Sequence, residues 1–295
     1  MLLGGVGLAV AAACGSSGGS DDSGAAAGAG GNDGGATTDS VLIAFFNISG
    51  GAVASGIDQR ITFGLGDSDG VVSDEVPPSL DFVIVSEAQN GEVATVTTAA
   101  RGEGIPRPYY PVRFTVPAPG NYAAVTTVDG EQVSAAFAVS DPAQVPLVQP
   151  GEPLIPVDTP TVADARGVDP ICTRDPQCPF HEVTLTEAIA EGRPIAFLLS
   201  TPEYCSTGIC GPTLDVLIDQ QAAYPDVRVV HAEIYADAGA VANLSEAQLA
   251  PAVDIYGLSF EPSLVLARAD GTVSDRLDNI YDVSELDEGL AAITS

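Results

Sequence analysis

Two cysteines five positions apart, Cys205 and Cys210, lie between a predicted buried strand and a predicted helix. The strand is the apolar run Ile195–Ser200, which turn residues follow directly. After the cysteines, Gly211-Pro212 suits the first turn of a helix, and apolar residues continue at helical spacing to Tyr224. A helix N-terminus lowers the pKa of a nearby thiol because its dipole favours negative charge. This order predicts that Cys205 is a nucleophile and that Cys210 is the resolving thiol.

From about Arg193 to Ile293 the chain resembles the thioredoxin superfamily. The aromatic-Cys start of the family's motif matches Tyr204-Cys205, and its cis-proline loop matches Glu261-Pro262-Ser263. The resemblance implies that the Glu261–Pro262 bond is cis, and that Pro262 and Ser263 receive the substrate backbone opposite Cys205. It also implies that Tyr204 contributes to substrate binding.

The C-x4-C spacing departs from the C-x-x-C motif of the oxidoreductases in this family. Residues five apart in a helix lie about 7.5 Å apart along its axis, whereas a disulfide needs Cα atoms within about 4.4–6.8 Å. If Cys205 and Cys210 are bonded, residues 206–209 therefore cannot be regular helix, and we expect Gly208 to supply an irregular turn. The strand before the motif also lacks the buried carboxylate that helps thioredoxins move the resolving proton. Thiol–disulfide exchange, a purely structural disulfide, and metal binding by these cysteines with a histidine, as in copper-delivering relatives of the fold, remain alternatives.

A second cysteine pair, Cys172 and Cys178, lies in a proline-rich turn. Thiols of exported proteins tend to oxidise, and four cysteines allow three pairings. Sequence proximity favours the pairs Cys172–Cys178 and Cys205–Cys210. Because Cys205 precedes a helix N-terminus, we expect Cys205–Cys210 to be the labile disulfide and Cys172–Cys178 to be an inert structural one. We interpret His181 as a turn residue and His231 as a buried, hydrogen-bonded histidine. The sequence predicts no bound metal and no other cofactor.

The N-terminus resembles a bacterial lipoprotein signal. Residues Met1–Ala13 are apolar and small, and Cys14 follows them. We expect residues 1–14 to be this signal, with Cys14 lipidated, and residues 15–39 to be a disordered spacer. The alternative is an Ala-rich disordered N-terminus with an incidental cysteine. The first interpretation places the protein on the extracytoplasmic face of the cell membrane, held by its lipid anchor only.

The rest of the chain predicts two domains, an all-β immunoglobulin-like sandwich followed by an α/β thioredoxin-like fold. Residues 40–140 form the sandwich, residues 141–170 a proline-rich linker, and residues 171–295 the thioredoxin-like domain. Pro119-Gly120-Asn121-Tyr122 looks like the tyrosine corner of immunoglobulin-like folds. The predicted sandwich strands are Val41–Phe46, Arg60–Gly64, Leu80–Val85, Val93–Thr98, Val112–Val116, Tyr122–Val128 and Val133–Val139.

In the second domain, Thr184 and Glu187 predict a capping box at the start of a short helix that ends at Gly192. A second helix is expected from about Ser245 to Tyr256, and a last one is capped by Asp282 with Glu285. The predicted strands after the cysteine helix are Val227–Tyr235, Ser263–Arg268 and Thr272–Leu277, with the first of them beside Ile195–Ser200 in the centre of the sheet.

Charge limits the partners of this 295-residue chain. It has ten arginines, no lysine and forty carboxylates, for a net charge of -30. Such a field repels nucleic acid and anionic lipid headgroups, so neither is an expected partner. We interpret the protein as an exported thioredoxin-like protein that exchanges thiols and disulfides with extracytoplasmic proteins. The alternative is a non-catalytic surface module in which both disulfides are structural.

Overall fold

The computed structural model describes residues 40–46, 49 and 51–295. The predicted signal 1–14, with Cys14, and the predicted spacer 15–39 lie outside the described residues. Within the described residues, no helix combines the length and the apolar character that crossing a membrane requires.

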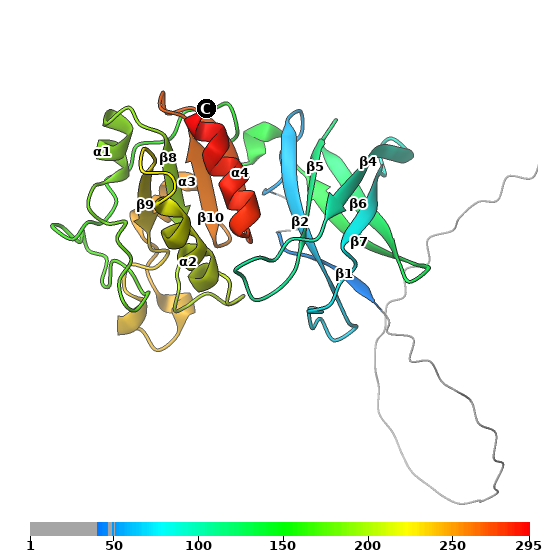
Figure 1. Ribbon diagram of the computed structural model, residues 1–295, viewed down its shortest axis with the longest axis horizontal. Coiled ribbons are helices and arrows are strands. Elements are labelled where there is room, and N and C mark those ends of the chain that lie inside the picture. Colours follow the sequence, from blue (N-terminus) through cyan, green and yellow to red (C-terminus); the bar gives the residue numbers. More distant parts are fainter. Residues whose placement is uncertain (1–39, 47–48, 50) are drawn as a thin grey trace, which may run out of the picture. The chain divides into compact units, whose positions relative to one another are not determined.

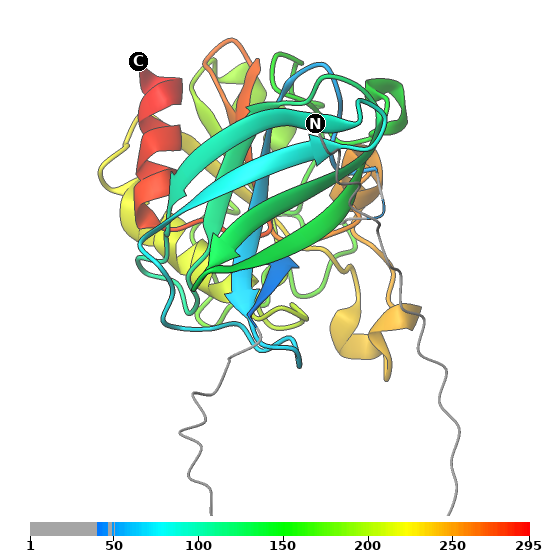
Figure 2. The same ribbon diagram turned by 90° about the vertical axis from the view of Figure 1, so that its right-hand side faces the viewer.

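The first part of the described chain, here called the β region, contains the seven strands that the sequence predicts. Their bounds are β1 (Val41–Ala44), β2 (Asp58–Gly66), β3 (Ser79–Ser86), β4 (Gly91–Ala99), β5 (Tyr110–Thr115), β6 (Gly120–Val128) and β7 (Glu131–Val139). They pair antiparallel in two sheets, with the orders β1-β2-β5 and β4-β3-β6-β7. Figure 2 shows these strands, coloured blue to green, from their broad side.

One apolar core joins the two sheets of the β region. Alternate residues of β3, namely Leu80, Phe82 and Ile84, are buried, as the two-residue period of a half-buried strand requires. Phe82 stacks on Phe63 of the other sheet, with ring centroids 5.4 Å apart. These strands therefore form a β-sandwich.

The predicted tyrosine corner is also present in the sandwich. The hydroxyl of Tyr122 donates a hydrogen bond of 2.6 Å to the carbonyl oxygen of Ala118. This is the contact to the upstream backbone that defines the corner. The closer assignment to the immunoglobulin-like folds stays a prediction.

The C-terminal part, here called the α/β region, has a four-stranded sheet with the order β11-β10-β8-β9. Strands β8 and β9 are parallel, whereas β10 is antiparallel to both of its neighbours, β8 and β11. A helix follows β8, as the sequence predicts. The elements are α1 (Leu185–Ala190), β8 (Ile195–Leu199), α2 (Cys210–Gln221), β9 (Arg228–Ala232), α3 (Pro251–Tyr256), β10 (Ser263–Ala267), β11 (Val273–Asp278) and α4 (Val283–Thr294).

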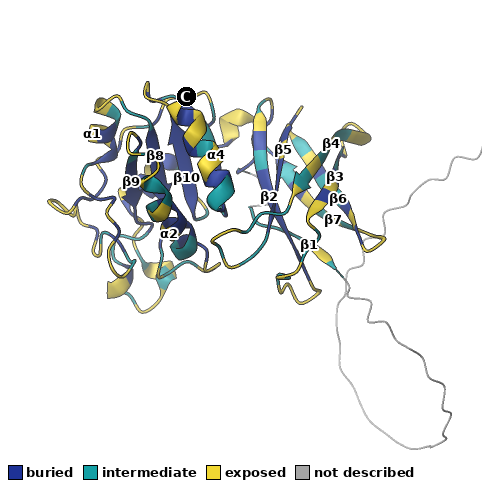
Figure 3. Ribbon diagram, in the orientation of Figure 1, coloured by how far each residue is buried: buried dark blue, intermediate teal, exposed yellow. Residues whose placement is uncertain are grey.

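Helices cover both faces of this sheet (Figure 1). Leu185 of α1 and Tyr256 of α3 pack in a core with Phe197 of β8. Leu214 of α2 and Leu290 of α4 pack in the core of the opposite face. Strands β8 and β10 are buried along their whole length (Figure 3), so they bring the residues at their ends to fixed positions.

Helix caps in the α/β region follow the sequence closely. Thr184 and Glu187 form the predicted capping box, and the side chain of Asp282 accepts a hydrogen bond from the backbone N–H of Glu285. Gly257 ends α3 in the left-handed conformation, with φ of 59°, which glycine adopts at no steric cost.

Two predicted elements differ from the structure. The strand that begins after Val227 lies at the edge of the sheet, as β9, and not in its centre. The helix predicted from Ser245 to Tyr256 is divided into a 3-10 turn, η3 (Leu244–Glu246), and the short helix α3. Pro251 explains the division, because proline has no N–H for a helix interior and is suited to the first turn.

The segment 141–170, expected to be a linker, is packed against the α/β region. After a 3-10 turn, η1 (Pro142–Gln144), six of its residues are buried in the core that contains α1 and α3: Val145, Leu147, Val148, Leu154, Val157 and Val168. Its prolines exclude regular helix and strand, but its apolar side chains still bury themselves against the sheet. The described residues accordingly form one compact unit, and the division into two domains stays a prediction.

A buried ion pair joins the β region to the α/β region. Arg60 of β2 donates two hydrogen bonds of 2.6 Å to the carboxylate of Glu285 on α4, and Tyr109 also donates to this carboxylate. Arg60 and Glu285 are 3% and 4% exposed. Arg60 further donates to the backbone oxygens of Asp278 and Ile280, so one guanidinium fixes the chain on the C-terminal side of β11.

Candidate active site

Cys205 and Cys210 lie where the buried strand β8 gives way to α2, as the sequence predicts. Cys210 is the first residue of α2, and Cys205 lies in the turn before it. Gly208 has φ of +68°, and its N–H donates a 3.0 Å hydrogen bond to the carbonyl oxygen of Cys205. The irregular turn expected from the C-x4-C spacing is therefore present, and Gly208 forms it.

The two thiols have opposite environments. Cys205 is half-buried, and its Sγ accepts a 3.4 Å hydrogen bond from the backbone N–H of Cys210 and lies 3.2 Å from the hydroxyl of Thr207. The hydrogen bond from the Cys210 thiol, ahead of these contacts, lowers the pKa of Cys205 to about 5 although burial opposes it. Burial and the neighbouring Cys205 raise the pKa of Cys210, which is fully buried. Cys205 is thus a thiolate at neutral pH while Cys210 keeps its proton.

The proline loop lies near this thiolate, since the charge of Cys205 acts on Glu261. The Glu261–Pro262 peptide bond is cis, which confirms the prediction. Tyr204 is half-buried, and its ring meets that of Tyr235 edge to face at 6.4 Å. Ser263 is buried in β10, and its hydroxyl donates a 2.6 Å hydrogen bond to Asp278. The Ser263 side chain is therefore engaged elsewhere, and only its backbone remains a candidate for substrate contact.

A carboxylate that the sequence analysis missed lies beside the cysteines. Burial, and then the charge of Cys205, raises the pKa of Glu261 to about 7, and Glu261 in turn raises the pKa of Cys210. The sequence analysis sought a carboxylate on the strand before the cysteines, where the thioredoxin family carries it. The signal that could have found Glu261 is its position directly before the cis-proline.

A cavity of about 310 Å³ opens next to this site. Thr207 and Ile209 of the cysteine turn line it, together with Glu261 and with Phe45 and Phe46 from the β region. Its walls combine aromatic and aliphatic side chains with polar ones, among them Ser259 and Asn279. That composition is typical of a binding site for apolar side chains.

The β region also holds the cysteine turn directly. Arg107, which lines the same cavity, donates a 3.0 Å hydrogen bond to the carbonyl oxygen of Thr207. Ile105 and Tyr109 of the same loop pack with Ile209 and Ile280. The β region is therefore part of the surroundings of Cys205.

The second cysteine pair is arranged differently from the prediction. All four cysteines in the described residues are free, so neither predicted disulfide is formed in this structure. Cys172 and Cys178 lie instead with His181 and His231 in one buried cluster. This group includes neither Cys205 nor Cys210, so the histidines do not complete the ligand set that the copper hypothesis requires. A four-residue group takes the place of the predicted Cys172–Cys178 disulfide.

Comparison with protein-family models and with curated proteins found no match. Among solved structures, one assigned as thiol:disulfide interchange protein DsbE from Chlorobium tepidum is similar to this chain, with 15% identity and a TM-score of 0.36. The match covers 50% of this chain and 99% of that one. The sulfur carrier protein SoxY from Chlorobium limicola f thiosulfatophilum matches with 17% identity and a TM-score of 0.21, over 35% of this chain and 76% of its own. Titin M4 matches with 12% identity and a TM-score of 0.21, over 36% of this chain and 99% of its own.

Proposed function

We propose that this protein catalyses thiol–disulfide exchange through Cys205 and Cys210. The observation that carries the proposal is the contrast between a half-exposed thiolate, whose pKa is lowered to about 5, and a fully buried protonated thiol beside it. The thiolate is the attacking form of cysteine. A low-pKa thiol next to a resolving thiol is the pair that exchange chemistry requires.

The reaction has two balanced steps. The Cys205 thiolate attacks one sulfur of a substrate disulfide, so a mixed disulfide forms while the second substrate sulfur leaves as a thiolate. Cys210 then loses its proton and attacks Cys205 Sγ, which releases the first substrate sulfur and forms the Cys205–Cys210 disulfide. The substrate gains two electrons and the protein loses two; the reverse sequence oxidises a substrate dithiol.

Glu261 is the proposed proton acceptor for Cys210 in the second step. Its carboxyl group has a pKa of about 7, so it exchanges protons near neutral pH, as a general base should. The cis-proline loop and the adjacent cavity are the proposed binding surface, where an apolar side chain next to the substrate cysteine would enter between Phe45 and Ile209.

Exchange is tested with the reduced full chain and a disulfide-bonded substrate such as insulin. Wild-type protein should reduce the substrate, Cys205→Ser should abolish the reaction, and Cys210→Ser should stop at a mixed disulfide that a mass spectrum detects. Ser206→Ala, which changes an exposed neighbour, is the matched control and should keep wild-type rates. Exchange that survives in Cys205→Ser would exclude the proposed nucleophile.

The same test separates the alternative of a non-catalytic module. If Cys205 and Cys210 form a disulfide that dithiol reagents open only after the fold is denatured, the pair is structural. The proposed catalytic function would then be wrong, whatever the state of the other cysteines.

We further propose that the protein acts at the extracytoplasmic face of the membrane, anchored through lipid on Cys14. The support is the apolar run Met1–Ala13 before the cysteine and the Gly- and Ser-rich segment after it. Mass spectrometry of the mature N-terminus in the native host should show acylated Cys14. An unmodified Cys14 still preceded by Ala13 would contradict the anchor.

A further inference from the structure

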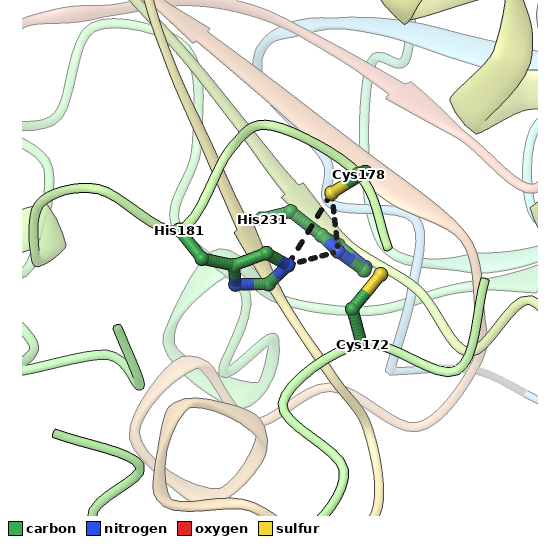
Figure 4. A group of neighbouring side chains, drawn as sticks. All are labelled: Cys172, Cys178, His181 and His231. Atoms are coloured by element: carbon green, nitrogen blue, oxygen red, sulfur yellow. Dashed lines mark hydrogen bonds between the residues drawn. The ribbon is translucent and has the colours of Figure 1, made fainter. Parts of the chain in front are cut away.

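Four side chains that could bind a metal converge inside the α/β region, and neither cysteine of the proposed catalytic pair is among them. Cys172, Cys178, His181 and His231 point toward one another (Figure 4). Their exposed fractions are 6%, 3%, 1% and 0%, and one ligand atom from each lies within 4.8 Å of all the others.

Three of the six distances between ligand atoms in this cluster, those among Cys178, His181 and His231, are close to the edges of a coordination tetrahedron. Cys178 Sγ lies 3.3 Å from His181 Nε2 and 3.4 Å from His231 Nδ1, and the two ring nitrogens are 3.2 Å apart. Zinc lies about 2.3 Å from thiolate sulfur and about 2.0–2.1 Å from histidine nitrogen, so its ligand atoms are roughly 3.3–3.8 Å from one another. The observed separations lie at the short end of this range or just below it.

Hydrogen bonds between neutral side chains account for two of these three contacts. The Cys178 thiol can donate to one ring and accept from the other, so the contact between the two ring nitrogens has no proton of its own. Two neutral histidines, two thiolates and one divalent cation instead give a neutral group. A neutral group avoids the large cost of isolated charges in a buried position.

The surroundings hold His231 in the orientation that a ligand needs. Its Nε2 lies 2.9 Å from the hydroxyl and 3.2 Å from the carbonyl oxygen of Ser200, the residue after β8. These contacts leave Nδ1 to face the cluster. Such a partner on the second ring nitrogen is typical of metal-binding histidines.

The loop that supplies the other three groups is anchored beside β9. The N–H of His231 donates a 3.1 Å hydrogen bond to the carbonyl oxygen of Phe180. On the Cys172 side, the N–H and hydroxyl of Thr173 donate to Glu233 at 2.7 and 2.6 Å. One end of the loop is thus attached to β9, which carries the fourth group, and the other end to the residue that follows β9.

We propose that Cys172, Cys178, His181 and His231 bind one structural zinc ion. Two thiolates and two imidazoles suit zinc and not calcium or magnesium, which take oxygen ligands. Four protein ligands in a closed, buried site leave no position for a substrate, which distinguishes a structural zinc site from a catalytic one. A disulfide between Cys172 and Cys178 would use the same two sulfurs, so the two states exclude each other.

The test measures zinc in the purified full chain, together with variants of each cysteine pair. Wild-type protein and Cys205→Ser/Cys210→Ser should both contain about one zinc per chain. Cys172→Ser/Cys178→Ser should lose at least about nine-tenths of the metal. This pair of double variants is matched, because each removes two cysteines from the same chain.

A second measurement covers the case in which Cys172→Ser/Cys178→Ser fails to fold. Zinc in wild-type protein is exchanged for cobalt(II), and the absorption spectrum should show sulfur-to-cobalt charge transfer and the visible bands of a tetrahedral ion. A chelator should then make two further thiols reactive. Wild-type protein that contains no metal, or that carries a Cys172–Cys178 disulfide, would overturn the proposal, and so would stoichiometric copper or a cobalt spectrum without sulfur ligation.

Discussion

The two cysteine pairs of this chain have nearly the same spacing and opposite environments. Cys205 and Cys210 are five positions apart, and Cys172 and Cys178 are six. The first pair combines a half-exposed and a buried thiol next to a cavity, near the carboxylate of Glu261 and the cis-proline that follows it. The second pair is buried with two histidines. The chemistry of a cysteine pair therefore does not follow from its spacing along the chain. It depends on the side chains that distant segments bring next to the pair.

The two sites are also connected to different parts of the molecule. The turn with Cys205 contacts the β region through Arg107 and Ile209, whereas the Cys172 cluster lies entirely within the α/β region. They are linked by one short path, because the N–H of Glu203 donates a 3.2 Å hydrogen bond to the hydroxyl of Thr173. Changes in the β region should therefore affect the first site and leave the second intact.

Among the variants that test this difference, we expect the largest effect from Arg60→Ala. The change leaves the Glu285 carboxylate buried without its guanidinium partner, and breaking a buried ion pair costs about 3–5 kcal/mol of unfolding free energy. It also releases the backbone of Ile280, which lines the cavity beside Cys205. Denaturant unfolding should show the loss, and alkylation of Cys205 in the native state should change while zinc content stays the same.

The control for this variant is Arg113→Ala. Arg113 pairs with Asp275 at 2.7 Å and lies 3.7 Å from Glu285, but it is 40% exposed. Its loss leaves Glu285 paired with Arg60 and should cost less than about 1 kcal/mol. Loss of zinc from Arg60→Ala under conditions where the chain is still folded would contradict the independence of the two sites.

The sequence correctly predicted the backbone elements that surround the proposed catalytic site. Strand β8, the start of α2 near Gly211, the turn at Gly208 and the cis bond before Pro262 all follow from local residue preferences or from the thioredoxin resemblance. These features depend on residues close together in the chain. Local patterns of this kind can be recognised in the sequence without knowledge of the three-dimensional structure.

The sequence did not predict what long-range packing brings together. His231 reaches Cys178 across 53 positions, and no local pattern joins a strand histidine to a proline-rich turn. The segment 141–170 was expected to be a linker because its prolines exclude regular structure, yet the burial of Val145 and Leu154 depends on a sheet that follows later. Glu261 was missed for a similar reason, since its proximity to Cys205 arises only when β10 pairs with β8.

The variant Glu261→Gln tests whether proton transfer at the Cys205–Cys210 site depends on Glu261. If Glu261 accepts the Cys210 proton, the second step of exchange should slow roughly a hundredfold, whereas the zinc content should not change. The wild-type rate of this step should rise with pH as Glu261 loses its proton. The midpoint should lie below about 7, because the charge of Cys205, one cause of the raised pKa, is absent from the mixed disulfide.

The matched control for Glu261 is Glu203→Gln. Glu203 is an exposed carboxylate two positions before Cys205, so it tests for a general effect of negative charge near the thiol. Stopped-flow measurement of mixed-disulfide decay separates the two variants. Equal rates for Glu261→Gln and wild-type protein across the pH range would exclude Glu261 as the base.

The smallest effect is expected from Thr207→Val, which removes one hydrogen bond from the Cys205 thiolate. The Thr207 hydroxyl lies 3.2 Å from Cys205 Sγ and, after the Cys210 thiol, helps to lower the pKa of Cys205 to about 5. The variant should raise that pKa, so less of the thiol is ionised at low pH. A rise of half a pKa unit would slow alkylation roughly threefold below pH 5. Well above the pKa, where Cys205 is ionised in both proteins, the thiolate fraction should be equal. Thr207→Ser keeps the hydroxyl and should restore the wild-type profile; a profile identical in all three proteins would show that the hydroxyl does not contact the thiolate in solution.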